Sequence, residues 1–592
     1  MRYRKLGLLL GLALLAVVVA TTASAKATGP GVTEVKPVSG PEGATVDRQI
    51  PGNQSPAHLA TTAAPRPAPL TVAQPGSELG TNFAGLTFHN QRRDADGGNQ
   101  LSLEPPDQGL CVGNGELIEP VNDLFATYDA STGARTSGFE SFDEFFFGKH
   151  EIDRTDPNNL VIGPFVSDPR CYYDASTNRF FMTMLSFGRD PVTGAFEAPG
   201  QVQIATSKGS NPTTDPSTWN FFTLDMTNDG TIAGEPTHPG CPCFGDQPLV
   251  GIDANGVYIS TNEFPIDPNT PGFNGAQVYA IQKSALIAGT TPNVQRFEGT
   301  QGPIPLDQTN YVNGIPGSLQ PALSPTGEFD SSDNGTEYLL GGLEFGKKPF
   351  QLDNRIAIWA LTNTGSLNDA TPNVHLTDKI ITSEVYGLPP AIVQPKGPTP
   401  LTDSFKEHES LIDGGDDRMQ AAIFEHGHLW GALDTTVKTP TRGVQVGTAY
   451  FMLTPSVDES GAVSGTMDKQ GYLSVNGNSV TRPSIGVTSA GKVVVGLSLI
   501  GPDFFPSAAY TTFDDSAGSA PTTLHVAAQA TVPDDGFSGL RAEGADGVAR
   551  WGDYGFAAVD GNSVWVANEW IPGLVQGADL ANWGTYVSKV TP

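Results

Sequence analysis

Basic residues are scarce in this chain. Lys and Arg number 33 against 63 Asp and Glu, which gives a formal net charge of -30 at pH 7. Nucleic acids and anionic membrane surfaces are bound through clustered lysines and arginines. The shortage of these residues excludes nucleic acid and lipid headgroups as partners. It leaves divalent cations, cationic partners and simple solubility as explanations of the acidity.

Long apolar runs are missing everywhere except at the N-terminus. There "LGLLLGLALLAVVVA" follows a basic start and ends at the small residues of 23–25. A basic start, an apolar stretch short of a comfortable membrane span and a small-residue cleavage site predict a signal peptide over 1–25. We therefore expect a secreted protein with no membrane span in the mature chain.

The stretch 26–80 has few aromatic residues and is rich in Pro, Ala, Thr and Gly. Such a composition cannot bury enough apolar surface to offset the entropy lost on ordering. We therefore predict a flexible leader over 26–80 and a folded region over 81–592.

Cysteine is also rare, with Cys111, Cys171, Cys241 and Cys243 as the whole set. An even number in an exported chain favours disulfides over catalytic thiols, and three pairings are possible. Cys-Pro-Cys lacks the spacing and the additional ligands of a zinc site. We predict Cys111–Cys171, because both lie early in consecutive repeats, which leaves Cys241–Cys243 as a local pair.

Helical periodicity and familiar catalytic signatures are absent as well. The chain has no Gly-x-Ser-x-Gly elbow, phosphate loop or dinucleotide fingerprint. Instead, short apolar runs such as "NRFFMTML", "GVYIST" and "SVWVAN" are bounded by Gly, Asn, Asp and Pro. This pattern is typical of strands and turns, so we predict an all-β protein.

One stretch of sequence occurs twice. "GDQPLVGIDANGVYISTNEF" begins at Gly245, and "GDYGFAAVDGNSVWVANEW" begins at Gly552. The shared unit is a polar residue, an apolar strand, a tight turn and a second apolar strand. Looser copies of it begin near Asp107, Asp168, Asp246, Ser318, Asp417, Arg482 and Asp553.

These repeats, each extended to a four-stranded meander, predict a seven-bladed β-propeller. The last unit ends one strand short at "GTYVSKV", while "FAGLTFHNQ" over 83–91 is a spare strand. We therefore expect this N-terminal strand to complete the last blade and close the ring. Insertions in the fourth unit leave six or eight blades open, and a pair of β-sandwiches is the alternative architecture.

The polar residues that begin the units would ring the mouth of the central channel. The predicted ligand-binding residues are Asp107, Asp168, Asp246, Asp417, Arg482 and Asp553. Carboxylates that converge on one axis repel one another unless a cation or an arginine offsets them. A hard cation such as Ca²⁺ would suit Asp168, Asp246 and Asp553. The alternative is structural, because Asp at a strand start often caps a turn.

Arginines near the same positions suggest catalysis as an alternative. The candidates for a catalytic site are Arg170, Arg418, Arg482, Asp168, Asp246 and Asp553. Arginine presents bidentate donors to a carboxylate, so the three arginines would grip an acidic substrate beside a protein acid. Pairing of each arginine with a neighbouring aspartate explains the same residues without catalysis.

Both copies of the duplicated stretch end in Asn-Glu, at Glu263 and Glu569. Two carboxylates in equivalent positions suit glycoside cleavage when they lie about 5–10 Å apart. Their blades are not neighbours, so this pair would have to meet across the axis.

Four segments carry a wider resemblance. They are "PPDQGLCVGNGELIEPVNDLFATYDASTG", "SDPRCYYDASTNRFFMTMLSF", "GDQPLVGIDANGVYISTNEF" and "RWGDYGFAAVDGNSVWVANEW". They resemble a family of secreted bacterial propellers of uncharacterised function, from which the chain departs at Cys111 and Cys171. The resemblance implies export and a propeller fold without implying an activity. Sialidases are similar more distantly, through one imperfect Asp-box over 331–338 in which Tyr338 replaces Trp.

Two functions therefore stay open. We expect a secreted, monomeric binding propeller that engages a carbohydrate, a protein or a cation at the channel mouth or on the blade loops. The alternative is an extracellular glycoside hydrolase or polysaccharide lyase, sialidase-like, with an arginine–carboxylate site in the channel. A deep pocket with two arginines and two carboxylates in contact favours the enzyme, and a shallow mouth favours binding. The fold alone does not decide between them.

Overall fold

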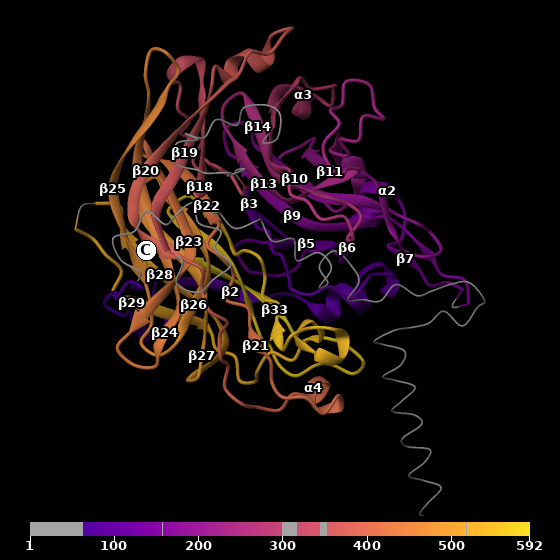
Figure 1. Ribbon diagram of the computed structural model, residues 1–592, viewed down its shortest axis with the longest axis vertical. Helices are drawn as coiled ribbons and strands as arrows, with labels where there is room; N and C mark the ends of the chain where they lie inside the picture. The colour runs from indigo at the N-terminus through magenta and orange to yellow at the C-terminus, as the bar shows by residue number, and fades with distance from the viewer. Residues whose placement is uncertain (1–62, 157, 299–316, 344–351, 517) are drawn as a thin grey trace, which may run out of the picture.

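The computed structural model describes residues 63–156, 158–298, 317–343, 352–516 and 518–592. Within them, seven sheets of four or five strands follow one another around a ring (Figure 1). The predicted seven-bladed β-propeller is confirmed, and each predicted unit forms one blade. The predicted signal peptide lies outside the described residues.

In each of the first four blades, the strands follow one another from the channel outwards. Blade 1 contains β3 (Cys111–Gly113), β4 (Glu116–Val121), β5 (Leu124–Asp129) and β6 (Glu140–Ser141). Blade 2 contains β9 (Phe165–Asp174), β10 (Arg179–Arg189), β11 (Phe196–Ser207) and β12 (Trp219–Asp225). Blade 3 contains β13 (Cys243–Ile252), β14 (Gly256–Pro265), β15 (Gly275–Gln282) and β16 (Val294–Glu298). Blade 4 contains β17 (Gln320–Pro321), β18 (Thr336–Gly342), β19 (Leu352–Thr362) and β20 (His375–Gly387).

The last two blades recruit strands from the N-terminal part of the chain. Blade 5 contains β22 (Met419–Glu425), β23 (His428–Thr439), β24 (Gly443–Val457) and β25 (Val463–Leu473). Blade 6 contains β26 (Ser479–Val487), β27 (Lys492–Gly501), β28 (Phe504–Asp514), β29 (Thr523–Ala528) and an added outer strand, β1 (Thr71–Ala73). Blade 7 contains β31 (Phe556–Asp560), β32 (Ser563–Trp570), β33 (Gly584–Val590) and β2 (Leu79–Thr87).

Strand β2 closes the ring, as expected, although it begins before residue 83 and ends at Thr87, so that 88–91 are helical and not part of the predicted strand. It pairs antiparallel with β33, with Phe83 opposite Val587, and Figure 1 shows the two strands adjacent. Glu119 of β4 joins this seam to blade 1. Its carboxylate accepts hydrogen bonds from the backbone N–H of Leu86 at 3.2 Å and from the hydroxyl of Thr585.

Residues 63–80, the end of the predicted flexible leader, lie against the propeller. The backbone N–H of Leu70 donates to Ser474 at 2.7 Å, and Thr71 pairs in parallel with Thr523. Leu70 is 6% exposed and belongs to the central apolar core. A few apolar side chains therefore anchor this part of a segment whose overall composition predicts disorder.

Both predicted disulfides are confirmed. Cys111–Cys171 joins the inner strands of blades 1 and 2 across a separation of 60 residues, with the two Cα atoms 5.3 Å apart. Cys241–Cys243 spans two positions at the start of blade 3, with the Cα atoms 4.4 Å apart. The first bond therefore links two blades, and the second links residues that are already neighbours in the chain.

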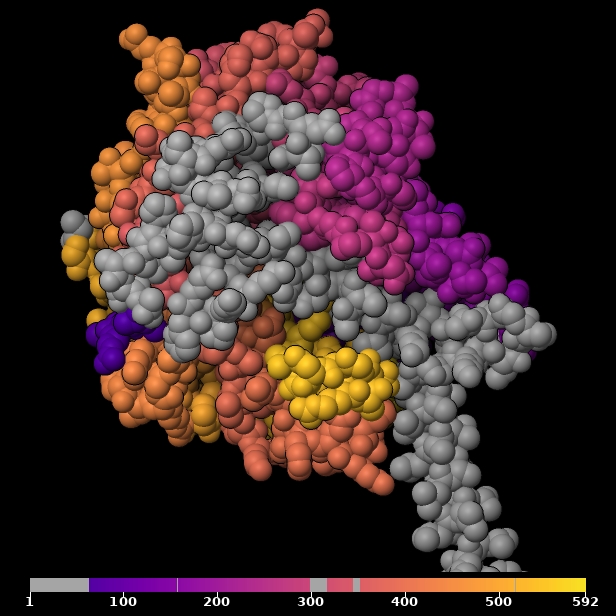
Figure 2. Space-filling view, in the orientation of Figure 1, coloured from indigo at the N-terminus to yellow at the C-terminus, as the bar shows by residue number. Residues whose placement is uncertain are grey.

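Short α-helices and two small strand pairs also lie between the blades in the described residues. They are the helices α2 (Phe142–Phe147), α3 (Lys283–Ala288) and α4 (Pro400–Ser404) and the strand pairs β7 (Ile152–Asp153) with β8 (Val161–Ile162) and β21 (Leu411–Ile412) with β30 (Val548–Ala549). Figure 2 shows α4 at the lower edge, beside the loops of the C-terminal blade. Asp535 fixes this arrangement, because it accepts from the backbone of Leu401 and donates its own N–H to Asn582. In the residues described here, no helix has the length and apolar character needed to span a membrane.

Candidate functional site

The inner strands are irregular where the predicted polar residues stand. A β-bulge interrupts the pairing of the innermost strand in blades 2, 3, 5 and 6. In three of these blades a residue before proline has a left-handed backbone: Asp168 (φ 54°), Gln247 (φ 48°) and Arg482 (φ 56°). This conformation costs a non-glycine residue about 1–2 kcal/mol. Bulges re-aim side chains, and such strain is concentrated at functional sites.

A narrow cavity along the axis shows where these side chains lie. Its lining includes residues from the inner strands of six blades, among them Arg170, Gln320, Gln420, Ser484 and Gly555. Residues 168, 318, 418, 482 and 553 each stand two positions earlier in the same strands or just before them. They therefore surround one end of the cavity, which is the mouth of the channel.

We call the charged residues gathered at this end the mouth cluster. It contains Asp107, Asp168, Asp246, Asp413, Asp416, Asp434, Asp553, Arg170, Arg418, Arg482 and Arg550. The cluster thus has seven carboxyl groups and four guanidinium groups. All of the predicted site residues except Asp417 belong to it.

The aspartates of blades 1, 2, 3 and 7 influence one another. The backbone N–H of Asp553 donates to Asp107 at 2.8 Å, and that of Gln247 donates to Asp168 at 3.1 Å. Burial, followed by the charges of Asp553 and Asp168, raises the pKa of Asp107 well above its ordinary value. Burial and the charge of Asp168 do the same to the pKa of Asp246. The predicted convergence of distant carboxylates is therefore present in the structure.

Arg418 is held by groups of the protein. Its Nη2 lies 2.6 Å from Oδ2 of Asp416, and its Nη1 donates to the side-chain oxygen of Gln247. Although burial opposes ionisation, the Arg418 guanidinium lowers the pKa of Asp416. Asp416, and not the predicted Asp417, is the ion-pair partner of this arginine. The side chain of Asp417 is completely buried.

Arg482 is also surrounded by acceptors. Its Nη1 lies 3.4 Å from Asp434 and its Nη2 lies 3.3 Å from Asp413. The same guanidinium donates to the carbonyl oxygens of Trp551, at 2.8 Å, and Gly552. Burial raises the pKa of Asp434 to about 7, and Arg482 opposes that rise. Arg482 therefore holds two carboxylates and the backbone before blade 7 in place.

The remaining two arginines are engaged in different ways. The Arg170 guanidinium lies 3.3 Å from the centre of the Tyr554 ring, and its Nε donates to the carbonyl oxygen of Pro248 at 3.2 Å. Arg550 forms an ion pair with Asp553 at 3.2 Å. Each arginine of the mouth cluster thus has a partner within the protein.

The cavity behind the mouth is small. Its volume is about 30 Å³, which is room for only about one to three water molecules. Outside, the side chains of Asp413, Asp416 and Asp553 are 48%, 32% and 34% exposed. Access from solvent is therefore to the rim of the mouth, and the cavity seen behind it among the described residues is too small for a sugar ring.

The structure does not join the predicted pair of glutamates. Glu263 accepts from His238, Asn228 and Asn274 within blade 3 and the loop before it. Glu569 accepts from the backbone N–H of Gly552 at 2.6 Å in blade 7. These partners have no residue in common, so each glutamate has a separate environment.

The described residues contain three groups in which three metal-ligating atoms lie within 4.8 Å of one another, and all three groups lie outside the mouth cluster. They are Cys241 with Cys243 and Glu263, Asp96 with Glu144 and His150, and Glu328 with Glu425 and His426. None of these groups of described residues lies in the mouth, so a cation there would need further ligands, such as water.

Sequence reasoning missed Asp413, Asp416 and Asp434 as members of the mouth cluster, and Tyr554 as the partner of Arg170. Tyr554 follows Asp553 inside the duplicated stretch, so the repeat itself contained a signal. Asp434 lies within β23 and Asp413 follows β21, away from the unit starts, so the repeat pattern gave no signal for them.

No family model and no curated protein matches this chain. Among solved structures, a protein of unknown function from Dyadobacter fermentans is 10% identical over 73% of this chain and 98% of that chain, with a TM-score of 0.31. A sialidase from Trypanosoma rangeli is 9% identical over 74% of this chain and 57% of that chain, with a TM-score of 0.30. An ulvan lyase of polysaccharide lyase family PL25 is 11% identical over 86% of this chain and 94% of that chain, with a TM-score of 0.32. All three matches have low identity and low TM-scores, so conclusions about function rest on the site alone.

Proposed function

We propose that this protein is a secreted binding propeller whose channel mouth holds a cation, with Ca²⁺ as the first ligand to test. The observation that carries the proposal is the imbalance of the mouth cluster, where seven carboxyl groups face four arginines. One oxygen of the fully buried Asp107, Oδ2, has no hydrogen-bond partner among the residues that the structure describes. A bound cation would supply the missing positive charge and a partner for this oxygen.

Hard oxygen ligands favour Ca²⁺ over softer metals at this mouth. Burial and neighbouring carboxylates raise the pKa values of Asp107 and Asp246, so ionising these carboxyl groups is unfavourable without a cation that offsets their charge. A cation would compete with protons for these groups, and its affinity should therefore increase with pH. This pH dependence distinguishes a site at the mouth from a site built on exposed aspartates.

The sialidase-like alternative has less support. Gripping the carboxylate of a substrate requires guanidinium groups that are not already paired. Arg418 and Arg482 are held by Asp416, Asp413 and Asp434, and the Arg170 guanidinium lies against Tyr554. The small cavity behind the mouth gives a saccharide no place to bind deeply. Both observations favour binding at the rim over catalysis in the channel.

An extracellular location fits this proposal. The two disulfides are typical of proteins from oxidising compartments. Calcium is also abundant outside cells, where sites with millimolar affinity suffice. A carbohydrate or protein partner would then contact the cation or the surrounding blade loops.

Calorimetric titration of the metal-free protein with CaCl₂ at pH 7.5 tests the proposal. We expect saturable heat and a higher melting temperature. Asp246→Asn and Asp553→Asn should each weaken binding at least about tenfold, since each removes a charged ligand. Asp458→Asn, in an exposed turn of blade 5, serves as the matched control and should bind as the unaltered protein does. Absence of heat and of thermal stabilisation, or equal weakening in the control, would refute the cation site.

A further inference from the structure

The second disulfide, Cys241–Cys243, has a position that stability does not explain. Only Pro242 separates the two cysteines, so the bond closes a very short loop and connects no two elements of the fold. The stabilisation expected from a disulfide grows with the length of the loop it closes. Cys111–Cys171 fits that role, with 60 residues of separation and both cysteines 1% exposed. Loop closure therefore gives Cys241–Cys243 much less stabilising effect than Cys111–Cys171.

The two sulfur atoms differ in accessibility. Cys241 is partly exposed and lies among the exposed residues Pro239, Gly240 and Pro242. Cys243 begins β13 and is completely buried. Disulfides are opened by a thiolate that attacks one sulfur while the other leaves. The arrangement therefore offers Cys241 to an attacking group and keeps Cys243 inside as the leaving group.

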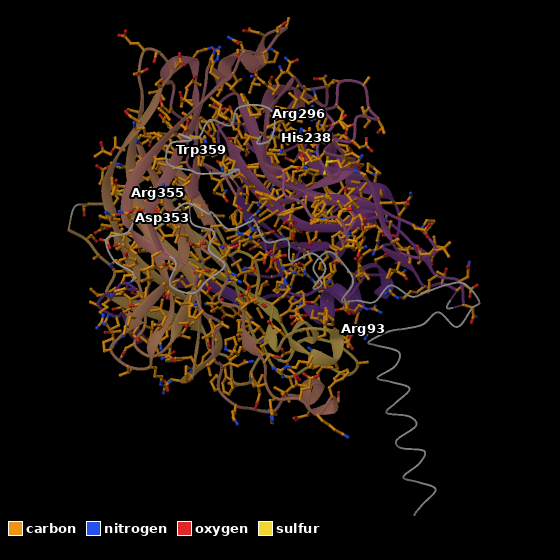
Figure 3. All side chains as sticks on the ribbon, in the orientation of Figure 1. Arg93, His238, Arg296, Asp353, Arg355 and Trp359 are labelled. Carbon is orange, nitrogen blue, oxygen red and sulfur yellow. A yellow bond between two sulfur atoms is a disulfide. The ribbon has the colours of Figure 1, made fainter. Side chains whose placement is uncertain are left out.

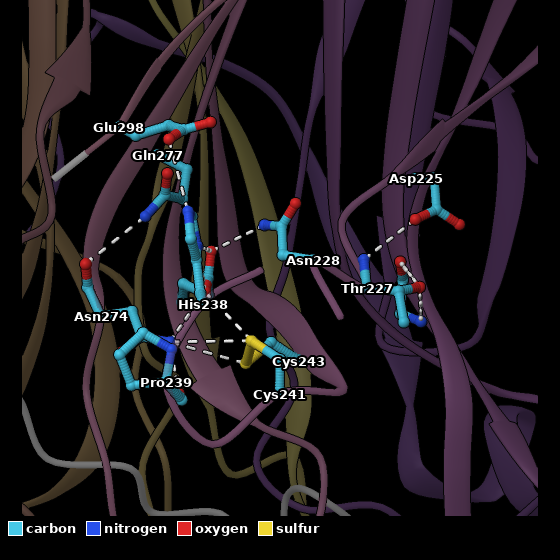
Figure 4. Close-up of a disulfide and its surroundings, with 12 residues drawn as sticks. Asp225, Thr227, Asn228, His238, Pro239, Cys241, Cys243, Asn274, Gln277 and Glu298 are labelled. Atoms are coloured by element: carbon cyan, nitrogen blue, oxygen red, sulfur yellow. Dashed lines mark hydrogen bonds and ion pairs between the residues drawn. A yellow bond between two sulfur atoms is a disulfide. The ribbon is translucent and has the colours of Figure 1, made fainter. Parts of the chain in front are cut away.

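Polar side chains surround the bond on its buried side (Figure 4). The side-chain amide nitrogen of Asn274 lies 3.7 Å from Sγ of Cys241 and 3.6 Å from Sγ of Cys243. Sγ of Cys241 lies 3.4 Å from Oε1 of Glu263, which is 1% exposed. A hydrogen-bond donor beside a sulfur stabilises the thiolate, and a carboxylate can accept or return its proton.

A row of titratable groups connects this carboxylate with the surface. Nδ1 of His238 lies 2.8 Å from Glu263, and Nε2 lies 3.3 Å from Glu298. The pKa of His238 is raised, because hydrogen bonds and charges of these two carboxylates outweigh the opposing effect of burial. Glu298 is 17% exposed and pairs with Arg296 at 3.0 Å. Figure 3 labels His238 and Arg296 close together, and both side chains contact Glu298.

We propose that Cys241–Cys243 is a thiol–disulfide exchange centre that oxidises a dithiol of a protein partner. A partner thiolate attacks Sγ of Cys241, and the bond to Cys243 breaks to give a mixed disulfide and the Cys243 thiolate. The second partner thiol then attacks the mixed disulfide, so that Cys241 leaves. The partner gains a disulfide, and both cysteines of this protein become thiols. The two protons released by the partner pass to the two new thiolates, with Glu263 and His238 as the nearest proton carriers.

Differential reduction of the native protein is the first test. After limited treatment with dithiothreitol, free thiols are trapped with N-ethylmaleimide and located by peptide mass spectrometry. We expect Cys241 and Cys243 to be labelled at least about a hundredfold faster than Cys111 and Cys171, since exposure and thiolate stabilisation set the rate. A reduced dithiol peptide should also be oxidised in a one-to-one ratio by the untreated protein. Equal resistance of both disulfides, or no oxidation of the peptide, would overturn the proposal.

Substitutions separate the chemistry from effects on folding. Glu263→Gln should slow exchange at least about tenfold and change its pH profile, because proton transfer is impaired. Glu569→Gln is the matched control, since Glu569 occupies the equivalent position of blade 7 and accepts its hydrogen bond from the backbone N–H of Gly552. Asn274→Ala is the second variant, which should slow exchange even if Glu263→Gln does not fold. Identical rates and pH profiles in the folded Glu263 and Asn274 variants and the control would contradict the assigned roles.

Discussion

Glu119 provides a sharp test of how the ring is closed. This glutamate is completely buried between blade 1 and the seam of β2 with β33. Burial raises its pKa from 4.5 to about 7, although hydrogen bonds from Thr585, Tyr128 and Leu86 oppose the rise. Glu119→Gln keeps the shape of the side chain and removes its ionisation. A comparison of the variant with the unaltered protein therefore measures how much the ionisation of Glu119 lowers the free energy of unfolding.

The sign and size of the effect follow from the two pKa values. Between pH 4.5 and about 7, the folded protein retains a proton that the unfolded chain has released, so the free energy of unfolding falls as pH rises. At pH 8 the accumulated loss is about 3 kcal/mol, because one pKa unit corresponds to about 1.4 kcal/mol. In the glutamine variant an NH₂ group takes the place of one carboxylate oxygen and cannot accept a hydrogen bond. This loss costs about 1 kcal/mol of stability and partly offsets the gain. We therefore expect Glu119→Gln to stabilise the protein by about 2 kcal/mol at pH 8 and by almost nothing at pH 5.

Urea unfolding followed by tryptophan fluorescence at pH 5, 6, 7 and 8 measures this difference. Glu197→Gln, which changes an exposed carboxylate of β11, is the control and should give superimposable curves at each pH. A stability difference between Glu119→Gln and the unaltered protein that stays constant from pH 5 to pH 8 would refute the reasoning. It would mean that ionisation of Glu119 does not destabilise the folded protein.

Two further substitutions test the mouth and the covalent link between blades. Arg482→Met should destabilise the protein by about 3–5 kcal/mol, because Asp434 loses its buried partner. Urea unfolding should show a larger loss at pH 8 than at pH 6, since the pKa of Asp434 is about 7 and its carboxylate needs the partner when it is ionised. Arg442→Met removes only the exposed pair with Asp503 and should change stability by less than about 0.5 kcal/mol. The double variant Cys111→Ser, Cys171→Ser should lose about 4 kcal/mol, as expected for its 60-residue separation. An unchanged urea midpoint in either case would show that the contact is not needed for the fold.

The ring could be predicted because its evidence is repeated along the sequence. Each unit begins with a polar residue and contains two apolar strands, so the seven inner strands were recognisable without any single strong motif. The spare strand predicted over 83–91 and the missing strand after β33 belong to one blade, as their complementary positions suggested. The same logic gave both disulfides, since Cys111 and Cys171 lie in neighbouring inner strands.

The identity of the residues that face the mouth was harder to predict. Asp416 and Asp417 are adjacent and chemically identical, yet it is Asp416 that pairs with Arg418. Likewise Gln247, and not Asp246, is the strained residue of blade 3. A β-bulge places two residues opposite one, so counting alternate positions fails beyond it. The position of a bulge depends on the neighbouring strand, and the local sequence does not give it.

Contacts between segments that are far apart in the sequence could not be predicted, for a different reason. His238 lies between Glu263 and Glu298, and Asp434 meets Arg482 from within another strand. These pairs arise from how loops and blades pack, and no fixed spacing along the chain marks them. The seam residue Glu119 is a similar case, because its partners Leu86 and Thr585 come from opposite ends of the folded region.

The pairing of β2 with β33 also constrains the order in which the molecule can be assembled. During synthesis β2 emerges early, whereas its neighbour in the finished wheel emerges almost last, so the edge of β2 must wait without its partner. Joining such remote segments is entropically slow. When many chains fold together, the unpaired β2 of one molecule can pair with the incomplete blade 7 of another. Strand exchange between copies is therefore the form of misassembly that we expect for this propeller.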